Sequence, residues 1–522
     1  MELNSIRAIE QASNLGRGEL FRLGTALLFI VGIMLIVSAR LEGIADSYLL
    51  VVAAMIGGYM AMNIGANDVA NNVGPAVGSQ ALTLTGAILI AAIFEAGGAI
   101  IAGGDVVSTI KKGIIDPALI ADSTTFIWVM MAALLAAAIW LNVATAVGAP
   151  VSTTHSIVGG VLGAGIAAAG WGIADWGTVG KIAASWVISP VLGGIIAASF
   201  LYMIKRTIVY RSDKIAASKR MVPYFIAIMT WAFSTYLIMK GLKKLWKFDI
   251  LSAGLIGLVI ALVIFILVKP LVNRKAKTLE NTRDSVNTLF TVPLIFAAAL
   301  LSFAHGANDV ANAVGPLAAI NDAILHGGVA AKAEIPLWVM MVGAVGIALG
   351  LALYGPKLIK TVGTEITELD KMRAYCVAMA AAITVIIASQ LGLPVSSTHI
   401  AVGGIFGVGF LREYLEANEA QVLDEIREHH IEDAPEVVDA FLDAFDKADV
   451  LEKGTMLADL KKKKGPHLLK KDRKQLRALY HKELVKRSML LKIAAAWVIT
   501  VPLAGVLAAM LYFMIRGMLL PH

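Results

Sequence analysis

Residues 65–75 read GANDVANNVGP, and residues 306–316 read GANDVANAVGP. Ten of the eleven positions are identical, which indicates an internal repeat. A second motif repeats in the same order, because PVSTTH at residues 150–155 returns as PVSSTH at residues 394–399. The chain is therefore predicted to contain two related halves, each with one Asn-Asp motif and one Ser/Thr motif.

The composition of the chain is that of a membrane protein. Of its 522 residues, 58% are hydrophobic and 16% are charged, and the mean hydropathy is +0.76. Soluble proteins carry about 25% charged residues, so an ordinary soluble enzyme and a disordered chain are both excluded. The net charge of +7 does not point to nucleic acid, because membrane proteins gather Lys and Arg in their cytoplasmic loops. We expect no nucleic-acid partner.

Apolar runs long enough to cross a bilayer recur along the whole chain. Two shorter, Gly-rich runs at 153–169 and 397–410 are either thin spans or halves of re-entrant hairpins. The fold class is predicted to be all-α, a polytopic protein of the cell (inner) membrane, in contact with lipids, with about 11–13 membrane segments. The longer runs lie near 21–39, 47–64, 82–103, 126–147, 182–204, 222–239, 250–268, 289–304, 337–354, 374–391 and 490–515.

Changes in composition suggest where the chain divides. Residues 411–488 are the only sizeable soluble segment. This segment is acidic in its first part and basic in its second part, which favours a solvated helical insertion. A regulatory or anionic-lipid-binding role for this insertion is also open. The predicted parts are an N-terminal span and lead-in (1–46), a first transport repeat (47–205), connecting spans with basic loops (206–288), the first part of a second repeat (289–410), the cytoplasmic insertion (411–488) and the last span (489–522).

The two halves are predicted to run through the membrane in opposite directions. If the run 153–169 crosses the membrane, the chain crosses the membrane an odd number of times between the two Asn-Asp motifs, and the halves are inverted. The same count places the basic segment 269–288 and the insertion on one side, as the positive-inside rule requires. The loop at 240–247 is also basic, so absolute orientation stays open. Inverted repeats with broken helices around a midplane site are typical of secondary transporters.

The Asn-Asp motif has the chemistry of a cation site. Asp68 follows an apolar span directly, and Asn67, Asn71 and Asn72 accompany it on one side of a turn. A carboxylate in the membrane needs a partner or a cavity, and Gly and Pro are expected to break the helix and free backbone carbonyls. Such oxygen ligands suit a hard cation, whereas a polar helix-packing contact is the alternative. The second copy supplies Asn308, Asp309 and Asn312.

The Ser/Thr motif has the chemistry of an anion site. Ser152 is placed to cap a helix, and Thr153 and Thr154 add hydroxyls to its first turn. The free amides at a helix start attract anions, although plain capping is the alternative. Neither motif contains Lys or Arg, so a bound cation is the natural source of positive charge. The second copy supplies Ser396, Ser397 and Thr398.

Other ionisable residues stand out in the apolar segments. Glu95 has no basic residue on its own run, so it is predicted to be a cation ligand or proton carrier, with a packed, protonated side chain as the alternative. His305 replaces Ile64 of the first copy, and its role is open. Lys111 and Lys112 are interpreted as interfacial anchors rather than as groups that steer anions.

These residues together resemble the inorganic phosphate transporter (PiT) family. The resemblance rests on the two repeated motifs, on IFEAG at residues 93–97 and on TIKKGIID at residues 109–116. It covers about 47–205 and 289–515, and it is greater to the sodium-coupled branch. It implies import of inorganic phosphate by symport with sodium ions, through alternating access, with no enzymatic activity and no cofactor besides the co-transported sodium. A homodimer is one assembly open to such a chain.

The resemblance also implies ligands. No acid lies between 372 and 390, which leaves the number of cations open. A proton-coupled phosphate symporter and a carrier of another oxyanion such as sulfate remain alternatives. The expected phosphate contacts are Asn67, Asn71, Ser152, Thr153, Thr154, Asn308, Asn312, Ser396, Ser397 and Thr398, and the expected sodium ligands are Asp68, Asn72, Glu95, Asp309, Asn67 and Asn308.

Overall fold

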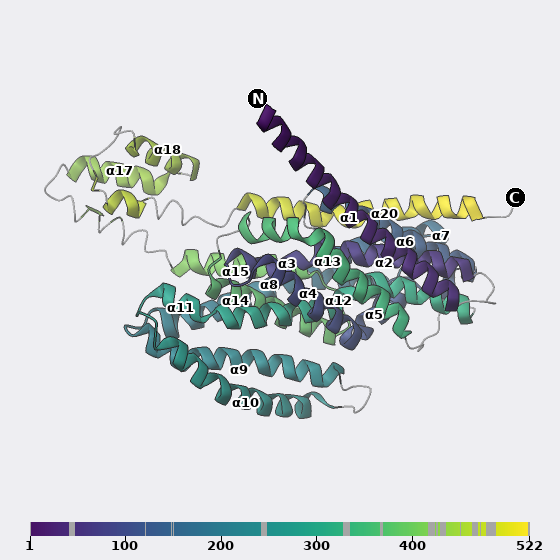
Figure 1. Cartoon of the computed structure of the whole chain (residues 1–522), viewed down its shortest axis with the longest axis horizontal. Coiled ribbons are helices and arrows are strands. Elements are labelled where there is room, and N and C mark those ends of the chain that lie inside the picture. The colour runs from purple at the N-terminus through teal and green to yellow at the C-terminus, as the bar shows by residue number, and fades with distance from the viewer. Residues whose placement is uncertain are drawn as a thin grey trace.

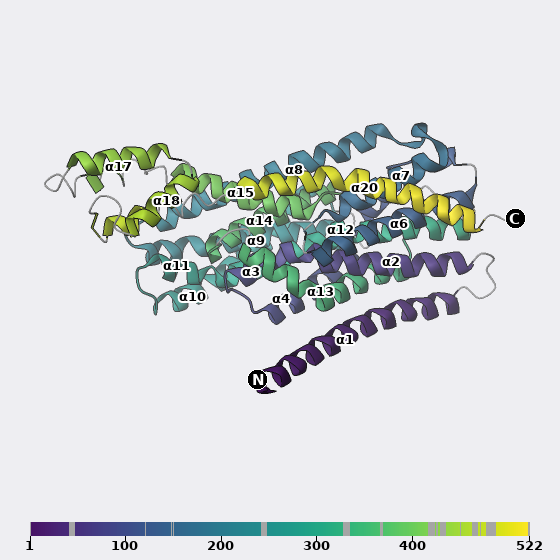
Figure 2. The ribbon, with the colours of Figure 1, turned by 90° about the horizontal axis from the view of Figure 1, so that it is seen from above.

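The computed structural model shows an all-helical bundle with one separate helical lobe (Figures 1 and 2). Within the described residues, eleven helices are long and apolar enough to cross a membrane, which confirms the predicted polytopic class and its eleven long apolar runs. The structure describes residues 2–40, 47–120, 122–147, 149, 151–241, 248–326, 335–365, 369–415, 423, 426–427, 435–448, 450–461, 468–469, 471–476 and 487–519.

Most of the long helices extend beyond the apolar runs, whereas α4 is slightly shorter than its run at 82–103. Short helices connect or end the long ones: α5 (Gly104–Lys112), α7 (Thr153–Ala169), α11 (Arg283–Leu289) and α15 (Ser397–Leu415). The long helices are α1 (Glu2–Arg40), α2 (Ser47–Asn67) continued by α3 (Val69–Gly78), α4 (Leu84–Ala102), α6 (Ser123–Val147), α8 (Trp176–Ile204), α9 (Lys214–Gly241), α10 (Ile250–Ala276), α12 (Thr291–His326), α13 (Leu337–Glu365), α14 (Lys371–Gln390) and α20 (Arg487–Leu519).

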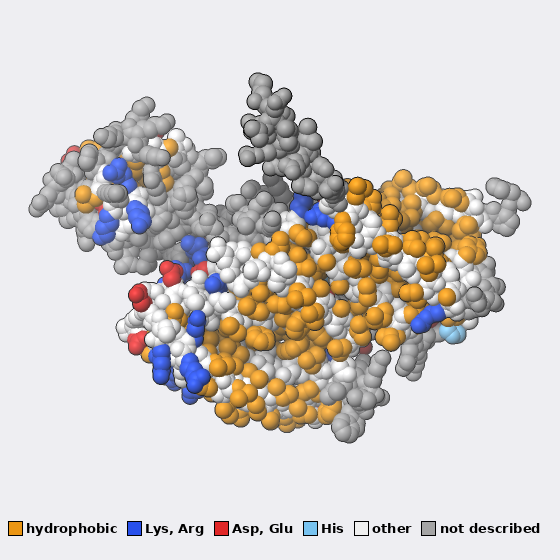
Figure 3. Space-filling model, in the orientation of Figure 1, with side chains coloured by type: hydrophobic (Ala, Val, Ile, Leu, Met, Phe, Trp, Pro, Cys, Tyr) orange, Lys and Arg blue, Asp and Glu red, His pale blue; other side chains and the backbone are white. Residues whose placement is uncertain are grey.

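Burial places α12 at the centre of the bundle. The most apolar window of α12 is 89% buried, against 17% for α1 and for α10, which lie on the outside (Figure 1). Apolar side chains cover a broad band of the outer surface, and Lys and Arg gather at one edge of it (Figure 3). This is the surface that a lipid environment requires, since the outward-facing side chains meet acyl chains instead of water.

Helices α6 and α7 form a hairpin. Ile115, just before α6, pairs with Ala174, just after α7. Asp116 N–H donates to Ile173 O at 2.8 Å, and Asp175 N–H donates to Ile114 O at 3.0 Å. The chain therefore returns to the edge from which it came, so 153–169 is half of a hairpin and not a span on its own. A hairpin changes the number of crossings by two, so the odd count is unaffected, and the inverted orientation of the halves stays a prediction.

Helices α14 and α15 pack against each other as a second hairpin, joined by a loop in which Gly392 has φ of +66°. We call residues 149–155, of which 150 lies outside the described residues, the tip of the first hairpin, and residues 391–399 the tip of the second. Both tips lie inside the bundle, because their hydroxyl-bearing side chains are at most 2% exposed.

The insertion folds apart from the bundle. Helices α17 (Pro435–Lys447) and α18 (Val450–Lys461) lie beyond one end of the membrane helices (Figures 1 and 2). Their apolar side chains share a small core with residues before and after them: Leu423, Ile426, Val438, Leu442, Phe445, Leu457, Leu460, Leu468 and Leu476. A distinct apolar core is what an independently folding insertion needs, although the exact boundaries 411–488 stay a prediction.

Candidate functional site

Asp68 lies at a break between two helices. Helix α2 ends at Asn67 and α3 begins at Val69, so the helix is interrupted at Asp68 alone. Helix α3 continues through Gly74 and Pro75, so the expected break at these two residues is wrong. The Asp68 carboxylate is 2% exposed. Thr153 Oγ1 donates to Asp68 Oδ2 at 2.6 Å, and Thr398 Oγ1 donates to Oδ1 at 3.1 Å. One carboxylate therefore joins the two hairpin tips.

Asp309 occupies the equivalent motif in a different backbone setting. Helix α12 is continuous through residues 306–316, so the expected helix break at the second copy is wrong. Proline and glycine are tolerated in a membrane helix where neighbouring helices satisfy its backbone, and α12 is packed on all sides. Asp309 Oδ2 lies 2.8 Å from His305 Nε2 and accepts a long hydrogen bond of 3.4 Å from Ser397 Oγ.

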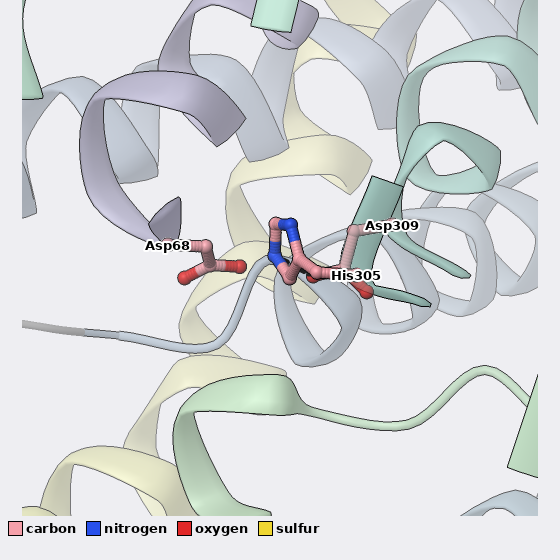
Figure 4. A group of neighbouring side chains, drawn as sticks. All are labelled: Asp68, His305 and Asp309. Atoms are coloured by element: carbon pink, nitrogen blue, oxygen red, sulfur yellow. Dashed lines mark ion pairs between the residues drawn. The ribbon is translucent and has the colours of Figure 1, made fainter. Parts of the chain in front are cut away.

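His305 connects Asp309 to a third carboxylate. Its Nδ1 lies 2.7 Å from Glu95 Oε2, while Asn72 Nδ2 donates to Glu95 Oε1 at 2.7 Å. The ligand atoms of Asp68, His305 and Asp309 all lie within 4.8 Å of one another. The imidazole ring lies between the two aspartates (Figure 4). His305 is thus a member of the site that sequence reasoning left without a role.

The contact between Glu95 and His305 depends on close packing of α4 against α12. A Cβ atom on Gly98 would lie 1.9 Å from Phe303 O, and one on Gly306 would lie 2.1 Å from Glu95 O. Real Cβ atoms cannot approach that closely, so only glycine permits this crossing. The glycine that opens each repeated motif is therefore a packing residue, and here it brings the acid of one helix to the histidine of another.

The two hairpin tips meet at the site. Ser152 Oγ accepts from His155 N–H at 3.1 Å, and Ser396 Oγ accepts from His399 N–H at 3.3 Å, which confirms Ser152 as a helix cap and shows the same contact in the second copy. Thr154 Oγ1 donates across to the second tip, to Val395 O, at 2.9 Å. The rings of His155 and His399 have centroids 4.4 Å apart.

Asn67 holds the loop of the first tip. Its Nδ2 donates to Thr145 Oγ1 at 2.9 Å and to Ala149 O at 3.2 Å, and its Oδ1 accepts from Val151 N–H at 3.2 Å. Asparagine can do this because its amide donates and accepts at once. The side chain therefore positions the tip, and its expected role as a ligand stays a prediction.

Asn308 does the same for the second tip. Its Nδ2 donates to Ser389 Oγ at 3.0 Å and to Leu393 O at 3.1 Å, and its Oδ1 accepts from Val395 N–H at 3.2 Å. The two amides make matching contacts in matching loops. This agreement indicates that each hairpin tip is fixed to the Asn-Asp motif of its own half.

A second pair of asparagines crosses between the halves. Asn71 Nδ2 donates to Thr398 Oγ1 at 2.8 Å, and Asn312 Nδ2 donates to Thr153 Oγ1 at 3.1 Å and to Thr154 Oγ1 at 3.2 Å. The structure therefore brings the two Asn-Asp motifs, Glu95 and the two hairpin tips together, with Ser152, Ser396, Asn67 and Asn308 bonded to the backbone of the tips. It does not test which of them contact phosphate or sodium.

The cluster is strongly negative. Asp68, Glu95 and Asp309 are each at most 2% exposed, and no Lys or Arg is among their described hydrogen-bond and ion-pair partners. With all three acids ionised, the formal charge is −3 with a neutral His305 and −2 with an imidazolium. Uncompensated charge of this size is not stable inside a membrane, so the site requires protons or bound cations.

Three buried oxygens add to the cation-binding capacity. Asn72 Oδ1, Asp309 Oδ1 and Asn312 Oδ1 have no hydrogen-bond partner among the described residues. Buried polar atoms are normally satisfied, and each exception needs an explanation. Carboxylate and amide oxygens are the ligands that a hard cation prefers, which makes a bound cation a suitable partner for these atoms.

Far from this cluster, ion pairs close one end of the bundle. Lys111 is only 4% exposed and pairs with the buried Asp322, and Lys240 pairs with Asp105. The interpretation of Lys111 as an interfacial anchor is therefore wrong, because a distant residue of α12 supplies its charge partner; the side chain of Lys112 lies outside the described residues. Thr109 Oγ1 also donates to Gly392 O at 2.7 Å, so α5 is fixed to the second tip.

Comparison with known proteins now identifies the family. A sequence model described as the phosphate transporter family matches residues 64–508. The chain belongs to the phosphate transporter family. It is a membrane transporter and not an enzyme.

The relatives described below match between 73% and 98% of the chain. A candidate phosphate permease of Helicobacter pylori strain J99 is 54% identical over 98% of both chains. Another from Thermococcus kodakarensis is 39% identical and covers 73% of this chain and 93% of its own. A solved structure described as the sodium-dependent phosphate transporter superposes with a TM-score of 0.74 at 32% identity, over 90% of this chain and 100% of that one. The transport family and the fold of this protein are thereby shown.

Proposed function

We propose that this member of the phosphate transporter family imports inorganic phosphate by symport with sodium ions. The observation that carries the proposal is the central cluster, in which three buried carboxylates with no Lys or Arg among their described partners lie beside two hydroxyl-bearing hairpin tips. A phosphate dianion cannot bind next to such a cluster unless cations neutralise it. Cations and anion are therefore expected to bind together.

The hydrogen bonds of Asp68 suggest how binding is coupled. Thr153 and Thr398 each have a single hydroxyl proton, and both protons point to the Asp68 carboxylate. A cation bound to Asp68 takes over the stabilisation of its charge, and the two hydroxyls are then able to donate to a phosphate oxygen. Sodium is thus expected to bind before phosphate and to complete the phosphate site.

The unpartnered oxygens favour sodium as the coupling ion. Amide oxygens of Asn72 and Asn312 are suitable ligands for a metal cation, whereas an amide is too weak a base to carry a proton. The name of the structural relative, a sodium-dependent phosphate transporter, agrees with this assignment. We assign the sodium ligands to Asp68, Asp309, Asn72 and Glu95, together with the amide oxygen of Asn312. We assign the phosphate contacts to the hydroxyls and amides of the tips, with the amide N–H groups of Asn71 and Asn312.

Proton coupling is the second candidate, and one observation favours it. His305 bridges Glu95 and Asp309 at 2.7 and 2.8 Å, an arrangement in which a proton is readily held between a base and two acids. In that case His305, Glu95 and Asp309 carry the coupling charge, and the amide oxygens have a structural role only.

Coupling is required by the energetics of import. Moving one elementary charge against 100 mV costs about 2.3 kcal/mol, so a dianion entering a negative interior costs about 4.6 kcal/mol. Two monovalent cations cancel this cost, and a third supplies a driving force. The charge of −2 or −3 in the central cluster is sufficient to hold two or three cations.

Alternating access follows from two hairpin tips that meet at the site. We infer that the first and second repeats are inverted, since the first hairpin enters and leaves at one edge and its tip meets the second tip head to head. Rocking of one repeat against the other would then expose the same site to either side. We assign the protein to the cell inner membrane, surrounded by lipids, and a homodimer is the assembly to look for.

Transport by the purified protein in proteoliposomes tests the proposal. Uptake of radiolabelled phosphate is measured with an inward sodium gradient, with an equal potassium gradient, and with an inward proton gradient in the absence of sodium. Sodium-driven accumulation is expected, with competition by arsenate but not by sulfate. Equal uptake in sodium and potassium, with stimulation by protons, would reject sodium symport in favour of proton coupling, and competition by sulfate would reject selectivity for phosphate.

A further inference from the structure

A cavity of about 560 Å³ lies between α1, α2, α6 and α13. Its volume is in the range of small-molecule sites, which is about 300–1,000 Å³. Its wall combines apolar side chains with the polar side chains of Tyr59, Asn63, Asn142, Thr145 and Tyr354. It also contains three charged side chains, Glu19, Arg22 and Lys357. We call this space the vestibule.

The inner wall of the vestibule adjoins the central cluster. Thr145, which lines it, accepts the hydrogen bond from Asn67 Nδ2, and Asn67 Oδ1 in turn accepts from Val151 N–H in the first tip. Ala66, another lining residue, directly precedes Asn67. A solute in the vestibule is therefore separated from the first hairpin tip by one side chain.

The vestibule supplies the positive charge that the central cluster lacks. Lys357 and Arg22 contribute two positive charges and Glu19 one negative charge, so the net charge is +1. Arg22 Nη1 lies 2.8 Å from Glu19 Oε1. Lys357 Nζ donates to Ala146 O at 3.3 Å, which places the ammonium over the last turn of α6, next to the first tip.

The vestibule and the buried ion pairs lie at opposite ends of the bundle. Helix α13 begins at Leu337, in an apolar pocket that contains Arg40 at the far end of α1, and it reaches the vestibule only at Leu353–Lys357. Lys111 with Asp322 and Lys240 with Asp105 close the other end. The end with the vestibule is the one at which α13 leads into α14 and on to the insertion.

We propose that the vestibule is the path of phosphate between the site and the insertion side of the membrane, and that Lys357 is a specificity-determining residue that attracts the anion. This inference rests on the proposed function and deepens it. The central cluster is expected to select phosphate through bound cations and hydroxyl groups. The positive charge of the vestibule instead raises the local concentration of dianions by long-range electrostatic attraction. Arg22 acts in the same direction, and Glu19 weakens the attraction.

Removing a positive and removing a negative charge from the vestibule are expected to shift the half-saturating phosphate concentration in opposite directions. Removing one charge at roughly 10 Å from a dianion changes its local concentration about two- to fourfold at low ionic strength. Lys357→Gln is expected to raise the half-saturating phosphate concentration by that factor, and Glu19→Gln is expected to lower it. Both changes should shrink as ionic strength rises towards 0.15 M or above, because the Debye length is then about 8 Å or less.

Phosphate–phosphate exchange in proteoliposomes, with equal sodium on both sides, measures this effect. Lys357→Arg keeps the charge and should resemble the wild type. Lys269→Gln is the matched control, because Lys269 is an exposed lysine on α10, a helix that does not line the vestibule. The half-saturating sodium concentration should stay unchanged in all four variants, since none of these side chains belongs to the central cluster.

The proposal is overturned if Lys357→Gln and Glu19→Gln leave the phosphate dependence unchanged or shift it in the same direction. It is also overturned if Lys357→Gln changes only the requirement for anionic lipid in the vesicles, because the cavity would then bind a lipid headgroup. A variant that does not fold is recognised by gel filtration, and the Glu19 variant then carries the test. Failure of the wild type to exchange phosphate would instead reject the proposed function.

Discussion

The two copies of the Asn-Asp motif are identical at ten of eleven positions, but their aspartates lie in different environments. Asp68 lies at a helix break and receives two threonine hydroxyls, at 2.6 and 3.1 Å. Asp309 lies in a continuous helix and faces His305 at 2.8 Å. Duplicated motifs therefore do not produce duplicated sites.

The difference comes from residues outside the identical part of the motif. His305 replaces Ile64, one position before the repeat begins, and Glu95 approaches it from α4. The threonine hydroxyls that donate to Asp68 can turn to a phosphate oxygen once a bound cation neutralises the carboxylate. Asp309 has a partner that is able to carry a positive charge of its own. The two aspartates are thus expected to have separate tasks, which substitutions can distinguish.

The largest effect is expected from Asp68→Asn and Asp309→Asn. Truncating one partner of a buried, hydrogen-bonded charge costs about 2–5 kcal/mol or more, and either variant should lose measurable phosphate uptake because a cation ligand is gone. Asp122→Asn is the control: the same chemical change at an exposed helix cap, where Asp122 Oδ1 accepts from Thr125 N–H at 2.7 Å. Normal uptake by a folded Asp68 or Asp309 variant would remove that aspartate from the mechanism.

The two ends of the bundle offer a second comparison, with buried ion pairs at one end and the vestibule at the other. Asp322→Asn leaves the Lys111 ammonium buried and unpaired, which typically costs about 3–5 kcal/mol. We expect a clear drop in the thermal unfolding midpoint in detergent. The double variant Lys111→Met with Asp322→Leu should recover most of it, since apolar residues often replace a buried pair without loss. No drop in the single variant would show that this pair does not hold the end closed.

His305→Gln is expected to have an intermediate effect that separates the two aspartates. The variant keeps a hydrogen-bonding side chain beside Glu95 and Asp309 but cannot carry a positive charge. If an imidazolium occupies the site, its loss makes the cluster more negative. The half-saturating sodium concentration should then fall, and the maximal rate should drop about tenfold, equivalent to about 1.4 kcal/mol.

Sodium titration of phosphate uptake at fixed pH measures this change, and Asn321→Gln on the same helix serves as a control for altered packing near the end of α12. An unchanged sodium dependence in a folded His305 variant would mean that the ring is neutral and structural. Loss of pH dependence in the His305 variant, with a wild type whose uptake does not depend on sodium, would favour the proton-coupled alternative.

Much of the fold follows from local sequence, and much of the site does not. Each apolar run corresponds to a helix because length and hydropathy decide membrane insertion, and Ser152 caps α7 because its neighbours along the chain supply the amide. The contacts of Glu95 with His305 and of Lys111 with Asp322 join residues more than 200 positions apart. Both contacts depend on how the helices cross. The crossing of α4 and α12, which brings Glu95 to His305, requires glycine at positions 98 and 306 because the two backbones lie too close for a Cβ atom.

The roles of Asn67 and Asn308 also depend on the folded geometry. Their residue type and place in a repeated motif correctly indicated a polar cluster, but the same amide chemistry serves a cation, a phosphate or a loop backbone. Only the positions of Val151 and Val395 show that both amides hold the hairpin loops. Composition and spacing can therefore predict that a polar residue lies at a site, whereas its bonding partners follow from the folded geometry.

The smallest effect concerns the caps that begin the two hairpins. Asp370 Oδ1 accepts from Arg373 N–H at 2.9 Å at the start of α14, as Asp122 does at the start of α6. Burial opposes ionisation of Asp370, but hydrogen bonds and charge from Arg373, together with Arg283, hold the pKa of this carboxyl below its usual 3.8. Asp122 is exposed. Loss of the Asp370 cap should therefore cost more.

Asp370→Ala removes both cap and charge and should lower the free energy of unfolding by about 1–2 kcal/mol, whereas Asp370→Asn keeps a capping oxygen and should cost less. A carboxyl whose pKa is lowered on folding stabilises the folded state above its unfolded pKa, and this contribution is lost as the pH falls through its folded pKa. The difference between wild type and Asp370→Asn in thermal unfolding is thus expected to be full at neutral pH and to shrink below about pH 4. A difference that persists at lower pH would mean that the Asp370 charge does not stabilise this hairpin, and that the two hairpins are anchored by their caps alone.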